Sequence, residues 1–455
     1  MQLRLLALLL GLMPFSALGA ISGGFEVPAG FEVTVFAGDD LAHDIYSMTT
    51  DAQGRIVVAG RRYVKVLHDT DGDGRADKVT DFAMLPKSGA RGMYFDGNHL
   101  IATGDNGLKI YRDEDGDGVA DGKPEKIFHV ASDGEHTANG IVKGPDGWLY
   151  VICGNEARIS HEHARSPGSP IRTNVVSGTL VRVSPDLKLS EVVAHGFRNP
   201  YDLDFDSRGM IFTYDSDGER DHYLPWYSGT RIFDVATGME HGWILRGWGH
   251  SWNRPESNFD NVQRVWDVGR GSPTGVKVYQ HHQFPQKYHN GLFAICWSLG
   301  RVYFFPLNRD GATVKSEMVV FMESASASGF APVDAVVGPE GDLFIAIGGR
   351  GTMGTVYRVT YTGSDSYDPI GSGVEAVINA PQPLSSWSRV KWVPLAKQLP
   401  ALEFEMAAKS RVGSRRSRMR SLEILVEVFD GVSASLAREL VGNHDPEIAA
   451  RAVWA

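Results

Sequence analysis

A short unit that recurs six times along the chain restricts the fold more than any other feature of the sequence. Each copy begins with a polar turn that contains glycine and continues into a short apolar strand rich in β-branched and aromatic residues. Glycine supplies the positive φ that a tight hairpin requires, so each copy predicts a strand–turn–strand unit. The copies are Asp51–Gly60, Phe95–Gly104, Gly144–Gly154, Asp206–Asp215, Tyr288–Trp297 and Gly338–Gly348.

Further strands flank most copies, so each unit predicts a small antiparallel sheet. One such sheet cannot bury both of its faces, whereas six sheets that pack on one another in a ring can do so. The segment Phe31–Gly38 precedes the first copy and is placed to complete the last sheet, which would close the ring and remove an open edge. We therefore expect an all-β six-bladed propeller over residues 31–361. A β-solenoid is the alternative, and the unequal spacing of the copies disfavours it.

The first 20 residues have the pattern of an export signal. Arg4 supplies a positive charge, Leu5–Leu12 is an apolar run too short to span a bilayer, and Ala17–Ala20 offers small residues for cleavage. We expect an exported protein of the periplasm or cell envelope. An uncleaved N-terminal anchor is the alternative, and it would associate the protein with a membrane.

The net charge and the cysteines indicate which partners and which covalent groups the chain is suited to. The chain has 455 residues and a net charge of −10, which disfavours nucleic acid as a partner and suits a hard cation better. Cys153 and Cys296 each lie in an apolar strand, which favours two buried thiols over a disulfide. The spacing that attaches a c-type haem, C-x-x-C-H, does not occur in the sequence.

Two loops, Asp69–Asp77 and Asp113–Asp121, share the first part of a calcium-binding pattern. Both have oxygen-bearing side chains at positions 1, 3, 5 and 9 and glycine at position 6, but the acidic residue usual at position 12 is missing. Carboxylates this close together would repel one another without a cation, so we expect structural calcium, with plain Asp-Gly turns as the alternative. The predicted ligands are Asp69, Asp71, Asp73, Asp77, Asp113, Asp115, Asp117 and Asp121.

An aromatic-rich insertion, residues 221–271, separates the fourth and fifth copies. Its tryptophans could stack on a sugar or a planar cofactor, or they could form a satellite core under long loops.

The composition changes after Tyr361. Residues 362–392 are rich in Gly, Ser and Pro and predict a linker, whereas residues 393–455 predict helices. Asp445 followed by Pro446 is a typical helix start. These helices resemble the start of a HEAT-type array. Because such an array needs several repeats for stability, we expect the chain to be truncated.

Several motifs occur in an order that indicates a known family: Gly134–Asn155, Ala194–Asp206, Tyr214–Tyr227, Gly271–Gly275 and Val333–Tyr361. Through them residues 31–361 resemble the sorbosone and glucose dehydrogenase superfamily of six-bladed quinoproteins, in particular the large exported PVC-type membrane-bound dehydrogenases. In those proteins helices and then a c-type cytochrome domain follow the propeller. The sequence here contains the start of the helices and no cytochrome domain.

The resemblance implies a redox site. His136 matches the general base that removes the substrate's hydroxyl proton, a role that suits the pKa of histidine. Arg198 and Asn199 match the pair that contacts the quinone oxygens, where a fixed cation stabilises the reduced ring. The segment that would hold a catalytic calcium, partly through backbone oxygens, contains Asp215, Asp217 and Glu219.

Two positions depart from the pattern of these quinoproteins. Gly300 lies where a lysine would bind a cofactor carboxylate, although the adjacent Arg301 could take that role. The arginines expected before the last inner strand are missing from Phe330–Pro332. Without these cations a tricarboxylate such as pyrroloquinoline quinone would bind weakly.

We therefore expect an exported quinoprotein-like dehydrogenase that oxidises a sugar or a related alcohol or aldehyde. Its cofactors would be calcium and pyrroloquinoline quinone, and a c-type cytochrome would accept the electrons. One alternative is a non-catalytic propeller that binds carbohydrate or a protein, which the missing cations favour. Another is a calcium-dependent lactonase, for which Asp215, Asp217 and Glu219 would surround the metal.

Overall fold

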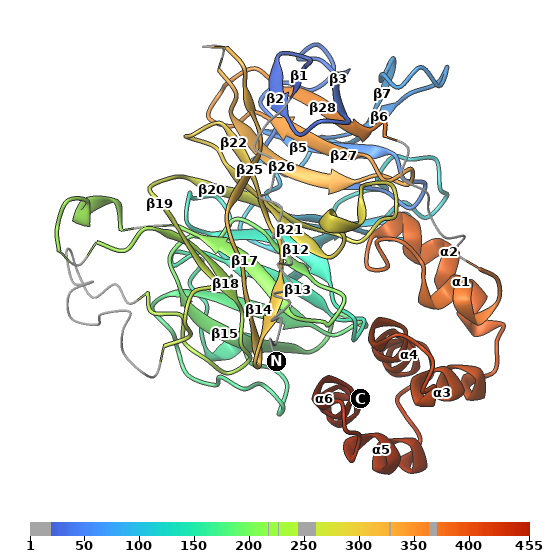
Figure 1. Ribbon diagram of the computed structural model, residues 1–455. Helices are drawn as coiled ribbons and strands as arrows, with labels where there is room; N and C mark the ends of the chain where they lie inside the picture. The colour runs from blue at the N-terminus through green and yellow to red at the C-terminus, as the bar shows by residue number, and fades with distance from the viewer. Residues whose placement is uncertain (1–19, 217, 226, 244–260, 327–328, 364–370) are drawn as a thin grey trace, which may run out of the picture.

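The computed structural model describes residues 20–455 except 217, 226, 244–260, 327–328 and 364–370 (Figure 1). Six antiparallel sheets surround a central axis, and helices follow them on one side of the ring (Figure 1). The inner strands contact one another in chain order, and the inner strand of the last blade contacts that of the first. The predicted six-bladed propeller is therefore confirmed. The predicted signal peptide lies almost wholly outside the described residues.

Blades 1 to 4 each contain four strands that run in chain order from the axis outwards. Blade 1 consists of β4 (Ser47–Thr50), β5 (Ile56–Gly60), β6 (Tyr63–His68) and β7 (Lys78–Ala83), and blade 2 of β8 (Met93–Asp96), β9 (His99–Thr103), β10 (Leu108–Tyr111) and β11 (Glu125–Phe128). Blade 3 consists of β12 (Ala138–Lys143), β13 (Leu149–Cys153), β14 (Gly178–Val183) and β15 (Ser190–Phe197), and blade 4 of β16 (Leu203–Phe205), β17 (Ile211–Asp215), β18 (Thr230–Asp234) and β19 (Trp266–Gly269).

The last two blades share the start of the chain. Blade 5 contains β20 (Pro273–Tyr279), β21 (Gly291–Cys296), β22 (Arg301–Phe305) and β25 (Val319–Ser324), with the small hairpin β23 (Asn308–Asp310) and β24 (Thr313–Lys315) before β25. Its outer edge is extended by β2 (Phe25–Val27) and β1 (Ala20–Ser22). Blade 6 contains β26 (Pro332–Val337), β27 (Leu343–Ile347) and β28 (Thr355–Tyr361), and β3 (Phe31–Ala37) completes it.

Ring closure depends on β3, which pairs antiparallel with β28 from Phe31↔Tyr361 to Ala37↔Val356. Phe31 also packs edge-on against Phe284 and Phe321 of blade 5. The start of the chain thus fills the open edge of the last blade, which confirms the role predicted for Phe31–Gly38.

The hydrophobic core is divided among the interfaces between neighbouring blades. Ile101 of β9 and Val151 of β13, for example, belong to one cluster, and Val58 of β5 and Ala346 of β27 belong to another. Because each sheet is covered on both faces, its second strand is buried along nearly its whole length rather than at alternate residues. Cys153 and Cys296 lie in such strands as buried free thiols, as predicted.

Helices α1 (Val374–Ile378), α2 (Ser386–Lys397), α3 (Ala401–Lys409), α4 (Arg415–Val428), α5 (Ala434–Val441) and α6 (Pro446–Trp454) pack on one another beside the propeller (Figure 1). They begin earlier than predicted, because α1 and part of α2 lie in the expected linker. The reason is burial: Trp387 and Trp392 are each 2% exposed. At α6 the predicted cap is present, since Asp445 accepts the N–H of Glu447. Among the described residues no helix is long and apolar enough to span a membrane.

Candidate functional site

A cavity of about 390 Å³ opens at the end of the axis where the six inner strands begin. This size is typical of sites for small molecules. Each blade contributes lining from the start of its inner strand: Tyr46, Arg91, His136, Tyr201, Thr274 and Val333. Successive blades thus bring residues from along the whole propeller to one place.

Three predicted site residues, His136, Arg198 and Asn199, line this axial cavity together. His136 precedes β12, and the other two lie in the connection from blade 3 to blade 4. Glu219, from the loop after β17, lines the same cavity. Asp217 lies outside the described residues.

The imidazole of His136 is oriented by Asn155, a residue that the sequence analysis did not single out. Nδ1 of His136 lies 2.8 Å from Oδ1 of Asn155. Because an amide oxygen only accepts, this bond places the proton on Nδ1 and leaves the lone pair of Nε2 available to a substrate. The backbone N–H of Asn155 also donates to the carbonyl of Arg198, at 2.7 Å. Asn155 therefore connects the two predicted halves of the site.

The Asp215 carboxylate holds the Arg198–Asn199 turn in place. Asp215 is fully buried, and its oxygens accept the backbone N–H groups of Arg198 (2.9 Å), Asn199 (2.8 Å) and Ser216 (2.8 Å). The buried guanidinium of Arg231 lies 3.6 Å away. A buried carboxylate is stable when it is paired and hydrogen-bonded in this way. These contacts give the Asp215 carboxylate a structural role, and metal binding by this segment stays a prediction.

Arg198 itself is held by side chains. Its Nη1 donates to Ser216 Oγ at 3.0 Å and to Glu219 Oε1 at 3.2 Å, and its guanidinium lies 5.6 Å from the centre of the Trp243 ring. Its side chain is 14% exposed. The positive charge is therefore fixed at the wall of the cavity before any ligand arrives.

Two further arginines line the cavity, and the sequence analysis missed both. Arg91 donates to the carbonyl of Ser132 at 2.8 Å, and Arg350 pairs with Glu135. Blades 3 and 6, which carry Glu135 and Arg350, face each other across the ring, so this pair spans the mouth of the cavity. Arg350 also lies 5.7 Å from the centre of the Trp297 ring. Arg91 lies outside the motifs named above and Arg350 lies inside Val333–Tyr361, but only the closed ring shows that both reach the cavity.

Arg91, Arg198 and Arg350 supply three guanidiniums to the cavity, which suit the carboxylates of a group such as a tricarboxylate quinone because each can donate two parallel hydrogen bonds. The lining also holds three carboxylates, of Asp133, Glu135 and Glu219, and the last two already pair with Arg350 and Arg198. Arg301, in contrast, begins β22 and lies outside the cavity lining, where its Nε donates to Glu323 at 2.8 Å. The structure therefore does not bring Arg301 together with the other residues predicted to bind the cofactor.

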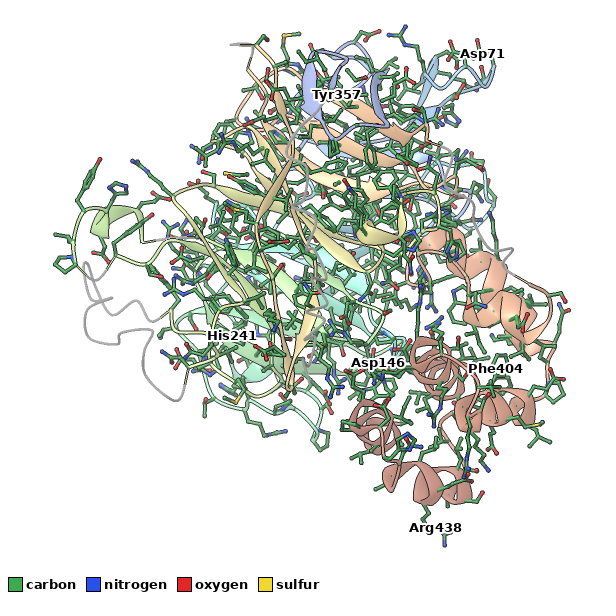
Figure 2. All side chains as sticks on the ribbon, viewed as in Figure 1. Asp71, Asp146, His241, Tyr357, Phe404 and Arg438 are labelled. Carbon is green, nitrogen blue, oxygen red and sulfur yellow. The ribbon has the colours of Figure 1, made fainter. Side chains whose placement is uncertain are left out.

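The two predicted calcium loops lie between the third and fourth strands of blades 1 and 2. The carboxylates of Asp69, Asp71 and Asp73 lie within 4.8 Å of one another, and so do those of Asp113, Asp115 and Asp117. The first aspartate of each loop accepts two N–H groups, from Gly72 and Gly74 or from Gly116 and Gly118. Asp77 and Asp121 bond to residues of their own loops. Figure 2 shows Asp71 on a protruding loop at the periphery.

Part of the aromatic insertion, including Trp248 and Trp252, lies outside the described residues. Trp243, at its described edge, contacts Arg198.

Solved structures with a similar fold include an oxidoreductase of Thermus thermophilus described as a glucose dehydrogenase (18% identity, TM-score 0.51, 72% of this chain and 100% of that one). The holo form of the PQQ domain of pyranose dehydrogenase from Coprinopsis cinerea is 12% identical, with a TM-score of 0.53 over 74% of this chain and 97% of that one. A calcium structure of a Trichoderma reesei family AA12 carbohydrate-active enzyme is 12% identical, with a TM-score of 0.56 over 76% and 99%. At such identities the likeness shows the fold alone.

No curated protein sequence matches this chain. The family model described as "Domain of unknown function (DUF7133)" matches residues 21–346, which is the propeller with its N-terminal strands but without the last strand of blade 6. This match spans well over half of the sequence, and the chain therefore belongs to the DUF7133 family.

Proposed function

We propose that this protein is a dehydrogenase that oxidises a CH–OH group of a sugar or a related alcohol or aldehyde in the axial cavity. The observation that carries the proposal is the pair His136–Asn155, which presents an unprotonated Nε2 in the same cavity as the fixed cation Arg198. The fold supports it, because structures that share the propeller include proteins described as glucose and pyranose dehydrogenases.

Oxidation of the alcohol removes a proton from the hydroxyl and a hydride from the carbon, which leaves a carbonyl. His136 Nε2 takes the hydroxyl proton as general base, while Asn155 holds the ring through Nδ1. Arg198, fixed by Ser216 and Glu219, stabilises negative charge that develops nearby. These residues act before and after the hydride leaves, and none of them needs to move.

A quinone held by Arg91, Arg198 and Arg350 would accept the hydride. We propose pyrroloquinoline quinone as this group, calcium as its companion ion, and a c-type cytochrome as the final electron acceptor of an exported enzyme. The neighbour described as the holo form of a PQQ domain supports the choice of quinone.

The test is dye-linked oxidation of a panel of aldoses after the protein has been loaded with the quinone and calcium. Activity is expected with at least one sugar, and His136→Gln is expected to reduce kcat by roughly a hundredfold or more without abolishing quinone binding. Calorimetry measures that binding separately. The proposal is wrong if the quinone does not bind and no sugar is oxidised.

A non-catalytic carbohydrate-binding propeller is the second candidate. The pairing of Arg198 with Glu219 and of Arg350 with Glu135 favours it, because carboxylates already partner two of the three cavity arginines. Saccharide binding that persists in both His136→Ala and Arg198→Ala would support this candidate. The lactonase alternative loses support, since the carboxylate of Asp215 is committed to backbone N–H groups and Arg231.

The two peripheral loops are proposed as structural calcium sites. Calcium at about 100 times its Kd is expected to raise the free energy of unfolding by about 2.7 kcal/mol for each site. The paired substitution Asp73→Asn and Asp117→Asn should remove the effect, and magnesium serves as the control ion. Unfolding curves that do not change with calcium would mean that the loops are plain Asp-Gly turns.

A further inference from the structure

Tyr201 reaches across the axis beneath the candidate site. It precedes β16 in blade 4 and lines the cavity, yet its hydroxyl donates to the carbonyl of Tyr46 in blade 1, at 2.6 Å. Blades 1 and 4 face each other across the ring, because the inner strands contact one another in chain order. The backbone carbonyl of Tyr201 accepts the N–H of Gly140 at 2.9 Å. The side chain is therefore fixed at both ends.

Two carboxyls lie directly behind the cavity lining. Asp202 and Asp334 directly follow the cavity-lining residues Tyr201 and Val333, and neither of them lines the cavity. Asp202 accepts the N–H of Val276 at 3.2 Å, and Asp334 accepts that of Met48 at 2.7 Å. Burial is the main cause that raises the pKa of both carboxyls, and their mutual repulsion raises the pKa of Asp202 further. Asp334 is 7% exposed, whereas Asp202 keeps part of its surface exposed, so the two carboxyls lie behind the cavity lining but are not equally buried.

The far end of the axis is closed as well. The ends of the inner strands surround a space of only about 60 Å³, which Gln382 and the residues after it cover. The side chain of Gln382 bonds to the backbone of Val278 at 3.3 Å and to that of Gln280, and Trp387 Nε1 donates to Val337 O at 3.1 Å. The segment between α1 and α2 thus covers one mouth of the propeller, and among the described residues the cavity opens on the opposite side, next to His136.

We propose that Tyr201 is the floor of the substrate cavity and determines which sugars fit. This inference rests on the proposed function, because it specifies the substrate range of the same site. The phenol lies between the cavity and the part of the axis where the carboxyls of Asp202 and Asp334 follow. Loss of the ring would deepen the cavity and make room for a bulky substituent on a sugar, whereas loss of the hydroxyl alone would leave the floor in place.

The first experiment compares Tyr201→Ala with Tyr201→Phe in the quinone- and calcium-loaded enzyme. The kcat/KM ratio of N-acetylated to unsubstituted hexoses is expected to rise about tenfold or more in Tyr201→Ala, since about one methylene group of pocket space already changes specificity by that factor. Tyr201→Phe should keep the wild-type ratio. An unchanged ratio in Tyr201→Ala, or the same change in both variants, would overturn the assignment.

A second experiment tests the floor without any enzymatic activity. A thiol is introduced below Tyr201 by Asp202→Cys or, if that variant does not fold, by Asp334→Cys, and its reaction with a small charged methanethiosulfonate is timed. The native thiols Cys153 and Cys296 are buried, so the parent protein gives the background rate. Adding Tyr201→Ala is expected to accelerate labelling at least about tenfold, whereas Tyr201→Phe should not.

The outcomes separate the two proposals. If Tyr201→Ala accelerates labelling and Tyr201→Phe does not, but no sugar is oxidised, Tyr201 is still the floor and the proposed dehydrogenase activity is wrong. Labelling that is equally fast with tyrosine, phenylalanine and alanine at position 201 would reject the floor, whatever the enzyme does.

Discussion

At the scale of single residues, the candidate site depends on side chains that hold others in place. Asn155 fixes the tautomer of His136, and Asp215 fixes the turn that carries Arg198. Neither is expected to contact the substrate. Their contributions can be measured because each has a substitution that keeps the size of the side chain and changes only its charge.

Asn155→Asp places a carboxylate beside Nδ1 of His136. The negative charge favours the imidazolium form of His136. Because the base must be unprotonated, the acidic limb of the kcat/KM profile is expected to move to higher pH. Asn155→Ala should instead lower kcat roughly tenfold or more with little displacement of the limb. A pH profile of Asn155→Asp that matches the wild type would contradict this role.

Asp215→Asn removes a buried charge without changing its shape. The amide group would turn two hydrogens towards backbone N–H donors and remove the charge that Asp215 places 3.6 Å from Arg231. We expect a loss of about 3–5 kcal/mol in the free energy of unfolding, measured with urea. Asp310→Asn, on the exposed β23–β24 hairpin, is the control and should change stability by less than about 0.5 kcal/mol.

At the scale of elements, β3 and the segment before α2 close the propeller at places far from them in the sequence. β3 is the outermost strand of blade 6, although it precedes the other strands of that blade in the chain by some 300 residues. The segment that begins with Gln382 seals the opposite mouth of the axis. Both segments are short, and both are held by buried aromatic side chains.

The stability lost in Phe31→Ala, compared with that lost in Val35→Ala on the same strand, tests how β3 closes the ring. Phe31 is 5% exposed and packs on three aromatic rings of blade 5, whereas Val35 is 36% exposed. Phe31→Ala is expected to cost about 3–5 kcal/mol in urea unfolding. Val35→Ala keeps the same backbone pairing and should cost less than about 1 kcal/mol. Equal losses would show that the backbone ladder, and not the aromatic packing, closes the ring.

At the scale of the whole molecule, the ring brings carboxyls from separate blades into one buried axis. A Cβ atom on Gly140 would lie 2.4 Å from Asp202 Oδ1, and one on Gly275 would lie 2.7 Å from Asp334 Oδ1. Glycine at these positions therefore leaves the room that the two carboxyls occupy. Lys277, which pairs with Asp204 at 3.2 Å, is the nearby cation.

The buried axis predicts a pH dependence of stability. Burial raises the pKa of Asp334 to about 6, although Lys277 opposes the shift. An aspartate in the unfolded chain has a pKa of about 3.9. Between these values the folded protein binds more protons than the unfolded chain, so its free energy of unfolding falls as the pH rises from about 4 to about 7. Asp334→Asn should flatten this decline in urea titrations, whereas Asp81→Asn on exposed β7 should leave it unchanged.

The sequence by itself determined the fold, because its information is local and repeated. Each glycine turn and apolar strand predicts one hairpin, and six such units without exposed apolar faces require a closed ring. Segment Phe31–Gly38 and helices such as α6 followed from equally local patterns of apolar residues and caps. His136, Arg198 and Asn199 were found because their motifs are continuous in the chain.

Only the tertiary structure decided which other residues share the axis. Arg91, Arg350 and Tyr201 meet there although they come from different blades, since ring closure brings the same end of each blade to a common wall. Arg301 begins the third strand of blade 5, two strands away from the inner one, and pairs with Glu323 instead. The composition of the segment after Tyr361, rich in Gly, Ser and Pro, likewise predicts a linker. The structure shows that Trp387 and Trp392 at its end are buried. Their burial depends on contacts with residues distant in the sequence, which composition does not reveal.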